Sequence, residues 1–221
     1  KILASAYNNI GMVHKSRGNF SQAIKAYYDA LKIFEKQGNE KEIGNAYNNL
    51  GLVYSDLKQY QTALDFHLKS LKIREKIGDK YGIGASTTNL GLTYSELNNT
   101  GKSLDYYLRS LRIKEEIGDK YGLGILLNNL ALIYMDKKDY KKALDMYGRS
   151  ARYHREVEDF NGLIFTYINT GVAYLRNEDY SKAEAMIDSA RNIATEIKSV
   201  SRLARVYAAY ALIYGNSGNY L

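Results

Sequence analysis

Apolar residues recur along the chain at the spacing of an amphipathic helix. In the segment AYNNLGLVY at 46–54, positions i, i+3, i+4 and i+7, which share one helix face, hold Tyr47, Leu50, Gly51 and Tyr54. The segment at 61–71 has the same one-sided pattern, formed by Ala63, Leu64, Phe66, His67 and Leu71. The pattern predicts a pair of helices joined by a short turn, referred to below as the first and second helix of a pair.

This two-helix pattern returns every 40 residues. AYNNIG at 6–11 recurs as AYNNLG at 46–51, STTNLG at 86–91, LLNNLA at 126–131 and YINTG at 167–171. Internal periods of 20 to 50 residues are typical of repeat proteins. We therefore expect an all-α chain of about eleven helices, forming one array over 1–221 with units 1–40, 41–80, 81–120, 121–160, 161–200 and a partial unit at 201–221.

Short polar segments mark the turns between the predicted helices. The sequence IGDK occurs twice, and it places Gly78 and Gly118 where a helix can end in the left-handed conformation. The aspartates that follow, Asp79 and Asp119, can cap the next helix. Proline is absent from the chain, which suits long helices joined by glycine and Asx turns.

Composition narrows the function classes. The net charge is +7, but no 40-residue unit exceeds +3, so the charge is spread and favours no nucleic-acid interface. The chain has no cysteine, which excludes disulfides, thiolate metal ligands and thiol catalysis. No apolar run reaches the ~18 residues of a membrane span, so we expect no membrane insertion of this segment.

The repeated units resemble tetratricopeptide repeats. The pattern of that family is a large residue, then Leu-Gly, Tyr, Ala, an aromatic residue and Ala at fixed intervals. The first unit meets it with Tyr7, Ile10, Gly11, His14, Ala23, Tyr27 and Ala30, and the second with Tyr47, Leu50, Gly51, Tyr54, Ala63, His67 and Ser70. The missing terminal proline and the 40-residue period, against the usual 34, indicate longer helices, as in kinesin light chains, spindle-orientation adaptors and repeat-containing bacterial signalling proteins.

The resemblance implies a right-handed α-solenoid of antiparallel helix pairs, five repeats plus part of a sixth. In such a solenoid the side of each first helix opposite the core lines a concave groove. One asparagine per unit falls on that side: Asn9, Asn49, Asn89, Asn129 and Asn169. Because an amide both donates and accepts, this ladder can bind the backbone of an extended peptide. The alternative is that the amides only tie neighbouring first helices together.

Other residues of the same side predict ligand specificity. A preceding asparagine is present in three units, as Asn8, Asn48 and Asn128. The groove floor is apolar, with Leu52, Leu92 and Leu132, and it becomes more apolar in the fourth and fifth units, with Ile125, Met135, Phe165, Ile168 and Leu175. We expect a hydrophobic anchor of the ligand near Phe165. The alternative is that Phe165 and Ile168 merely pack between long helices.

The sequence predicts no catalytic residue, metal site or cofactor. His14, His67 and His154 stand in different units without ligand spacing. The last unit stops within its second helix and carries apolar Tyr207, Tyr210, Ala211 and Tyr214, so we expect a fragment of a longer protein whose open end favours self-association.

The function expected from the sequence is that of a noncatalytic scaffold that holds a protein or peptide in the groove. The family resemblance favours the sensory or regulatory segment of a bacterial signalling protein, as a soluble cytoplasmic or extracytoplasmic portion. A free-standing adaptor or peptide receptor is the alternative. The sequence does not decide the compartment.

Overall fold

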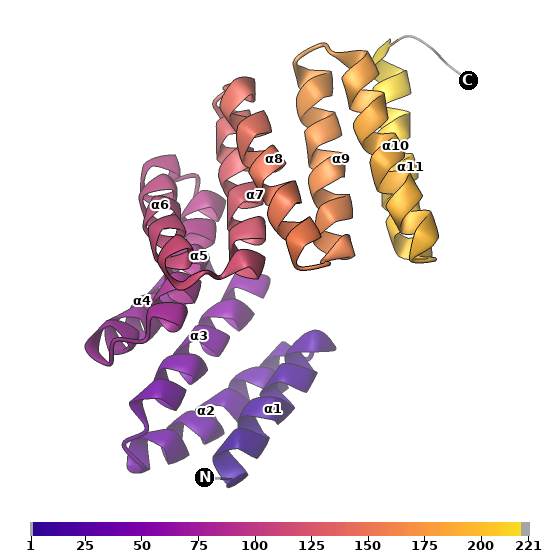
Figure 1. The fold of residues 1–221 in the computed structure, drawn as a ribbon. Coiled ribbons are helices and arrows are strands. Elements are labelled where there is room, and N and C mark those ends of the chain that lie inside the picture. Colours follow the sequence, from indigo (N-terminus) through magenta and orange to yellow (C-terminus); the bar gives the residue numbers. More distant parts are fainter. Residues whose placement is uncertain (1, 218–221) are drawn as a thin grey trace. The chain divides into compact units, whose positions relative to one another are not determined.

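The computed structural model describes residues 2–217, and this part of the chain folds into eleven α-helices without a strand (Figure 1). The helices are α1 (Ile2–Ser16), α2 (Phe20–Lys36), α3 (Glu40–Asp56), α4 (Tyr60–Lys76), α5 (Lys80–Glu96), α6 (Thr100–Ile117), α7 (Lys120–Asp136), α8 (Tyr140–Glu156), α9 (Phe160–Arg176), α10 (Tyr180–Glu196) and α11 (Val200–Ser217). The predicted all-α class is confirmed, and each whole 40-residue unit holds one pair of helices.

The turns follow the chemistry that the sequence indicates. Gly78 and Gly118 have positive φ angles of 68° and 70°, in the left-handed region. Asp79 then accepts a hydrogen bond from the Gly82 N–H at 3.0 Å, and Asp119 caps the next first helix in the same way. The predicted helix ends at these two turns are confirmed.

Other turns take the left-handed conformation without glycine. Lys58, Asn98 and Lys138 have φ angles of 58°, 56° and 58°. For residues with a Cβ this conformation costs roughly 1 to 2 kcal/mol. The geometry of the turn is therefore imposed by the packing of the helices on either side, and no glycine in the sequence marks it.

Small residues allow the two helices of a pair to approach closely. The Cα of Gly51 faces the ring of His67, and an added Cβ would lie 2.5 Å from the ring. Gly91 stands in the same relationship to Tyr107, at 2.4 Å. Ser70 donates a hydrogen bond from its hydroxyl to the Gly44 carbonyl at 2.8 Å. These contacts explain the recurrent glycine and serine positions.

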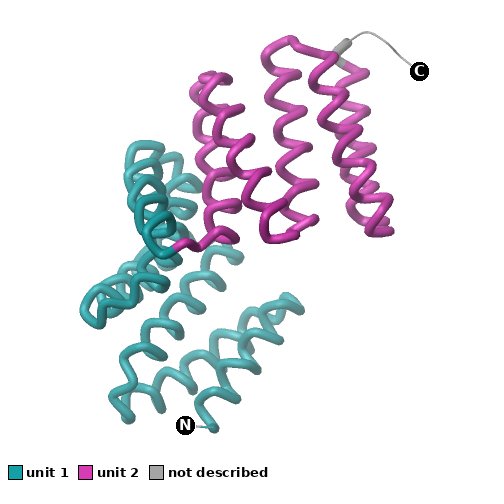
Figure 2. The backbone as a smooth tube through the Cα atoms, viewed as in Figure 1, with its two compact units in different colours: residues 1–117 teal, residues 118–221 magenta. Residues whose placement is uncertain are grey.

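The chain divides into two compact units, residues 1–117 and residues 118–221 (Figure 2). Unit 1 holds α1 to α6, with core clusters around Tyr27, Leu50 and Leu90. Unit 2 holds α7 to α11, with cores around Tyr147 and Ile187. The single array over 1–221 remains a prediction.

Candidate functional site

The asparagines of neighbouring first helices are bonded to each other. In unit 1, Asn49 Nδ2 donates to Asn8 Oδ1 at 2.9 Å. In the next repeat, Asn89 Nδ2 donates to Asn48 Oδ1 at 2.9 Å. Unit 2 contains the same bond, from Asn169 to Asn128 at 3.2 Å. Three of the five ladder asparagines therefore bind the first asparagine of the preceding repeat, which is the contact expected if amides tie first helices together.

Asn129 differs from these three residues. Thr88 stands at the repeat position of Asn48 and Asn128, and its hydroxyl is engaged with the Gly84 carbonyl at 2.9 Å and the Ser110 hydroxyl at 2.7 Å. Within the described part of unit 2, the Asn129 side chain has no hydrogen bond to another residue. Its donors and its acceptor are therefore available within that unit.

A cavity of about 280 Å³ opens beside Asn129 in unit 2. We call it the Phe165 cavity; it is lined by Tyr121, Ile125, Asn128, Asn129, His154, Asp159, Asn161, Gly162, Phe165 and Arg202. Ile125 and Phe165 are each 39% exposed, so both apolar side chains present surface to solvent. The structure thus brings Asn129 together with Ile125 and with Phe165, near which the sequence predicts a hydrophobic anchor.

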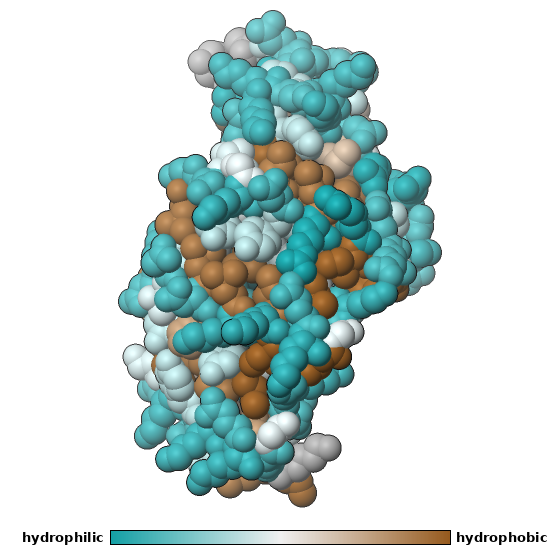
Figure 3. Space-filling view, turned by 90° about the vertical axis from the view of Figure 1, so that its left-hand side faces the viewer, coloured by the Kyte–Doolittle hydropathy of each residue, from teal (hydrophilic) through white to brown (hydrophobic). Residues whose placement is uncertain are grey.

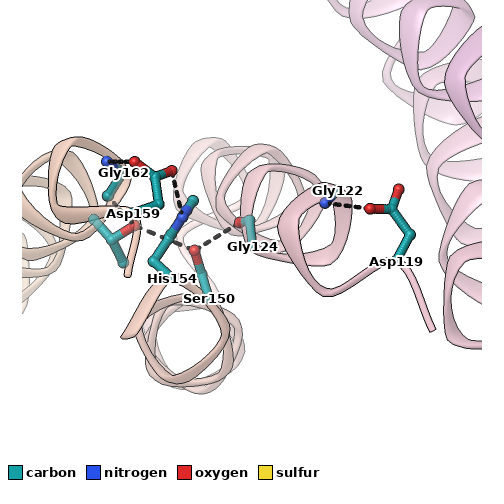
Figure 4. Close-up of polar contacts among 8 residues, drawn as sticks. Asp119, Gly122, Gly124, Ser150, His154, Asp159 and Gly162 are labelled. Atoms are coloured by element: carbon teal, nitrogen blue, oxygen red, sulfur yellow. Dashed lines mark hydrogen bonds and ion pairs between the residues drawn. The ribbon is translucent and has the colours of Figure 1, made fainter. Parts of the chain in front are cut away.

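The polar base of the Phe165 cavity is built at the start of α9 (Figure 4). His154 is only 2% exposed, and its Nδ1 lies 2.9 Å from Asp159 Oδ2. The other oxygen of Asp159 accepts a hydrogen bond from the Gly162 N–H at 2.9 Å, which caps the helix. Burial lowers the pKa of His154, against the opposing effect of Asp159, so the imidazole is neutral at pH 7.

Gly162 makes room for this arrangement. A Cβ at residue 162 would lie 2.3 Å from His154 Nδ1 and 2.4 Å from the Asp159 carboxylate. Arg202, which also lines the cavity, donates a hydrogen bond from its Nε to Asn161 Oδ1 at 3.0 Å. The base of the cavity is therefore held by a set of mutually bonded groups, with apolar walls above it.

The sequence profile described as tetratricopeptide repeat matches residues 2–76, 42–116 and 122–196. The chain belongs to the tetratricopeptide repeat family. None of the curated proteins matches the chain. In the described residues, no helix has both the length and the hydropathy required to cross a membrane.

Solved structures share the tetratricopeptide repeat fold. BtubC from P. vanneervenii is 23% identical, with a TM-score of 0.75 over 86% of this chain and 78% of that one. A Rap protein complexed with competence and sporulation factor is 20% identical, with a TM-score of 0.83 over 96% of this chain and 59% of that one. A signal transduction ATPase with a tetratricopeptide repeat sensor, from Pyrococcus horikoshii, is 23% identical, with a TM-score of 0.82 over 96% of this chain and 32% of that one. They confirm the predicted solenoid class.

Several predicted groove residues lie on exposed surface of the tetratricopeptide repeats. Leu92 and Leu132 are exposed and Leu52 is half-buried. The ladder residue Asn9 is also exposed. Apolar side chains appear among hydrophilic ones on the face drawn in Figure 3.

Other predicted groove residues also take part in the packing between repeats. Leu175 is 8% exposed and shares a core cluster with Ile187 and Ile213, but it also lines a cavity of about 310 Å³ together with Leu212, so its place in the groove remains a prediction. Ile168 packs against the same cluster and Met135 against another, so both are half-buried. Asn128 is buried as well; its amide oxygen accepts the bond from Asn169, and the residue also lines the Phe165 cavity. A helical wheel places these residues opposite the core of their own pair but does not include burial by the next repeat.

The apolar end predicted for the last repeat is also partly covered. Tyr207 is exposed, whereas Tyr210 is buried and its hydroxyl bonds Asp188 of α10. Tyr214 donates to Glu184 at 2.5 Å. Self-association through this end remains a prediction.

A second cavity, of about 370 Å³, lies in unit 1. We call it the Arg74 cavity; it is lined by Lys41, Asn45, Arg74, Asp79, Tyr81, Gly82 and Ala85. Arg74, Asp79 and Gly82 occupy the repeat positions of His154, Asp159 and Gly162. Each of the two compact units therefore contains a cavity at this position of a repeat, and the two cavities have different linings. No feature of the apolar pattern marked Arg74 as a site residue.

Proposed function

We propose that the chain is a noncatalytic scaffold that binds a protein or peptide partner on the exposed face of its first helices, with the Phe165 cavity as a principal contact. The observation that carries the proposal is the position of Asn129. Its amide has no hydrogen bond in its own unit, and it lines a cavity with Ile125 and Phe165. An amide beside apolar walls suits a peptide, whose backbone bonds the amide while a side chain fills the cavity.

Within this proposal the ladder asparagines have two roles. Asn49, Asn89 and Asn169 hold neighbouring first helices through their side-chain bonds. Each retains one amide hydrogen and its carbonyl oxygen for a ligand. Asn129 offers its whole amide and is the main backbone contact. Asn9, exposed on the first helix, extends the same line of amides.

The protein context that we propose is the sensory or regulatory segment of a bacterial signalling protein. Two structures with this fold support this context: a Rap protein in complex with competence and sporulation factor, and a signal transduction ATPase with a tetratricopeptide repeat sensor. A free-standing adaptor or peptide receptor is the second candidate, favoured by the likeness to BtubC, 78% of which the chain covers. Sequencing the complete gene separates the two candidates.

Selection of a displayed random-peptide library on the 221-residue chain tests the binding function. Affinities of synthetic copies of the selected peptides are then measured by fluorescence anisotropy with Phe165→Ala and Asn129→Ala. We expect each variant to weaken binding about tenfold, which corresponds to ~1.4 kcal/mol.

Phe160→Ala is the matched control, because Phe160 is an exposed phenylalanine of the same helix that does not line the cavity. It is expected to bind like the original chain. If the library yields no binder, the binding function is wrong. If peptides bind equally well to Phe165→Ala and Asn129→Ala, this position for the site is wrong.

A further inference from the structure

His154 occupies a repeat position that holds a buried basic residue in three consecutive repeats. Arg74 and Lys114 stand at this position in the two preceding repeats and are 5% and 6% exposed. In each of the three repeats an aspartate follows five residues later. The guanidinium of an arginine stays protonated in proteins, whereas an imidazole gains or loses its proton between pH 5 and 8. The same position therefore holds a permanent cation at Arg74 and a titratable group at His154.

The His154 ring lies among acceptors at the base of the Phe165 cavity (Figure 4). Its Nδ1 is buried, lies 2.9 Å from Asp159 Oδ2, and forms no well-aligned hydrogen bond with a described residue. Burial lowers the pKa of His154, and Asp159 and the Gly124 carbonyl offset this effect only in part. The neutral ring is therefore favoured at pH 7, and the proton enters as the pH falls.

Three other ionisable side chains line this cavity among the described residues. Tyr121 comes from α7, Asp159 from the turn before α9, and Arg202 from α11. Arg202 Nε donates to Asn161 Oδ1 at 3.0 Å. Histidine is the side-chain type that ordinarily changes charge between pH 5 and 8. A change of affinity in this range is therefore assigned to His154.

The apolar walls couple the charge of His154 to the ligand. Ile125 and Phe165 are each 39% exposed and line the same cavity as the imidazole. An apolar side chain that fills this cavity displaces water from its base, and loss of water disfavours the charged form of a histidine. Because such a ligand binds better to the neutral form, uptake of the proton weakens its binding.

The fold is compatible with a charge at this position. Arg74 is buried at the equivalent place in unit 1, and its Nη1 donates to the Gly82 carbonyl at 2.6 Å. A protonated His154 has the Asp159 carboxylate 2.9 Å from its Nδ1. Protonation is therefore expected to change the cavity without unfolding the repeat.

We propose that the Phe165 cavity releases its peptide ligand on acidification, because protonation of His154 places a charge next to the apolar side chain that fills the cavity. This regulation rests on the peptide-binding function proposed above.

The direction of the effect follows from the burial of the ring. Since burial lowers the pKa of His154 below its ordinary value of 6.5, the ring is neutral above pH 6.5 and the ligand is bound fully there. Affinity is lost progressively as the pH falls below this value.

Fluorescence anisotropy at pH 7.5 and pH 5.0 tests the proposal on the 221-residue chain. The probe is a selected peptide with blocked ends that contains no histidine, aspartate or glutamate, so that the ligand itself does not titrate in this range. We expect the dissociation constant to rise at least about threefold at pH 5.0, within the limit of about tenfold per pH unit for one linked proton. Circular dichroism at both pH values verifies that the chain remains folded.

Neutral variants at residue 154 identify the titrating group. His154→Gln keeps a polar side chain that does not titrate, so we expect it to bind the probe equally at the two pH values. His154→Phe is the second neutral variant, because Phe34 is 1% exposed at the equivalent position. His67→Tyr is the matched control, since it removes a buried histidine of unit 1 that does not line the cavity. This variant should retain the full pH dependence.

A permanent charge at residue 154 should mimic acid. His154→Arg introduces the side chain that is accommodated at position 74. We expect this variant to bind the probe at pH 7.5 about as weakly as the original chain does at pH 5.0. Its affinity should not change further on acidification.

NMR titration of the histidine Cε1–H resonances follows the proton directly. The resonance of His154 is identified by its absence from His154→Gln. We expect the pKa of His154 to be lower in the complex with the probe than in the free chain, because the ligand removes water from the ring.

Equal dissociation constants at the two pH values would overturn the proton regulation and leave the peptide function standing. The same conclusion follows if the pH dependence persists in both neutral variants, or if the ligand leaves the pKa of His154 unchanged. If no selected peptide binds at pH 7.5, the peptide function fails and its regulation falls with it.

Discussion

Asn89 donates a hydrogen bond to Asn48, a residue 41 positions earlier, and so joins the first helices of two consecutive repeats. Asn49 and Asn8 are joined in the same way. In each case the asparagine that directly precedes the Leu-Gly of one repeat binds the first asparagine of the NN pair in the preceding repeat. The two asparagines of a pair therefore act as partners in neighbouring repeats, and neither is a redundant polar residue in a helix.

A double-mutant cycle on Asn48 and Asn89 measures this bond. We expect a coupling free energy of about 0.5 to 1.5 kcal/mol between Asn48→Ala and Asn89→Ala, the usual range for a neutral hydrogen bond. Urea unfolding followed by circular dichroism provides the measurement. The control pair is Asn9→Ala with Asn89→Ala, which share no bond and should be additive. A cycle on Asn48 and Asn89 that is additive within error would contradict the structure.

His67 makes stability depend on pH. Its side chain is fully buried and neither ring nitrogen has a partner among the described residues, and burial lowers its pKa to about 4. The unfolded chain, with a pKa near 6.5, takes up the proton first, so stability is complete above pH 6.5 and is lost as pH falls towards 4. The loss over this window is of the order of 3 kcal/mol, at ~1.4 kcal/mol per pH unit.

His67→Tyr is the matching variant, because Tyr27 and Tyr107 occupy the equivalent position in the neighbouring repeats. We expect the free energy of unfolding of this variant to fall less between pH 7 and pH 5 than that of the original chain. His154 contributes to both proteins and cancels in the difference. Parallel pH dependences of the two proteins would show that His67 is not buried as a neutral ring.

Glycine-to-alanine substitutions at two helical positions should change the free energy of unfolding in opposite directions. Gly91→Ala places a Cβ 2.4 Å from the Tyr107 ring, so we expect a loss of about 1 to 3 kcal/mol from overpacking. Gly148 has no atom near its added Cβ, so Gly148→Ala should stabilise the chain by up to about 1 kcal/mol through helix propensity. Thermal unfolding of both variants checks the pair. Equal effects would mean that Gly91 does not mark a close helix crossing.

The turn at Lys58 offers a stabilising change. Lys58 has a φ angle of 58°, and glycine adopts this conformation without a Cβ clash. We expect Lys58→Gly to raise the free energy of unfolding by about 0.5 to 1 kcal/mol, the strain relieved less the greater entropy of the unfolded chain. Lys69→Gly, in the middle of α4, should instead lower it by about 1 kcal/mol. Stabilisation by both or by neither would be inconsistent with a strained turn.

The fold was predictable because its determinants are local and repeated. The spacing of Tyr47, Leu50 and Tyr54 defines a helix face, and five copies of the pattern define the helix pairs. The caps at Asp79 and Asp119 depend on only the next three residues, and both were predicted. The left-handed turn at Lys58 was not, because its residue has no preference for that conformation.

The site was predictable only in part. A helical wheel was enough to predict that Phe165, Ile125 and Asn129 share one side of their helices, and they line one cavity; their role in binding stays a prediction. The low exposure of Leu175 was not predicted, because it depends on residues of the next repeat, such as Ile213. The sequence does contain a signal for the buried basic residues. The position five residues before a helix cap is basic where the cap is an aspartate, as at Asp79, and apolar where it is Ser199.

The Asn49–Asn8 bond also has a consequence for how such a chain can lengthen or shorten. The bond spans 41 residues, one more than the repeat, so gain or loss of a 40-residue block that carries both asparagines keeps the spacing of an equivalent bond. Excision of residues 41–80 would bring the sequence position of Asn89 to that of Asn49, opposite Asn8. An insertion of one or two residues within α3 ahead of Asn49 would instead turn this amide away from Asn8, because successive helical residues lie ~100° apart. The paired asparagines therefore favour gain and loss of whole repeats and disfavour drift in repeat length.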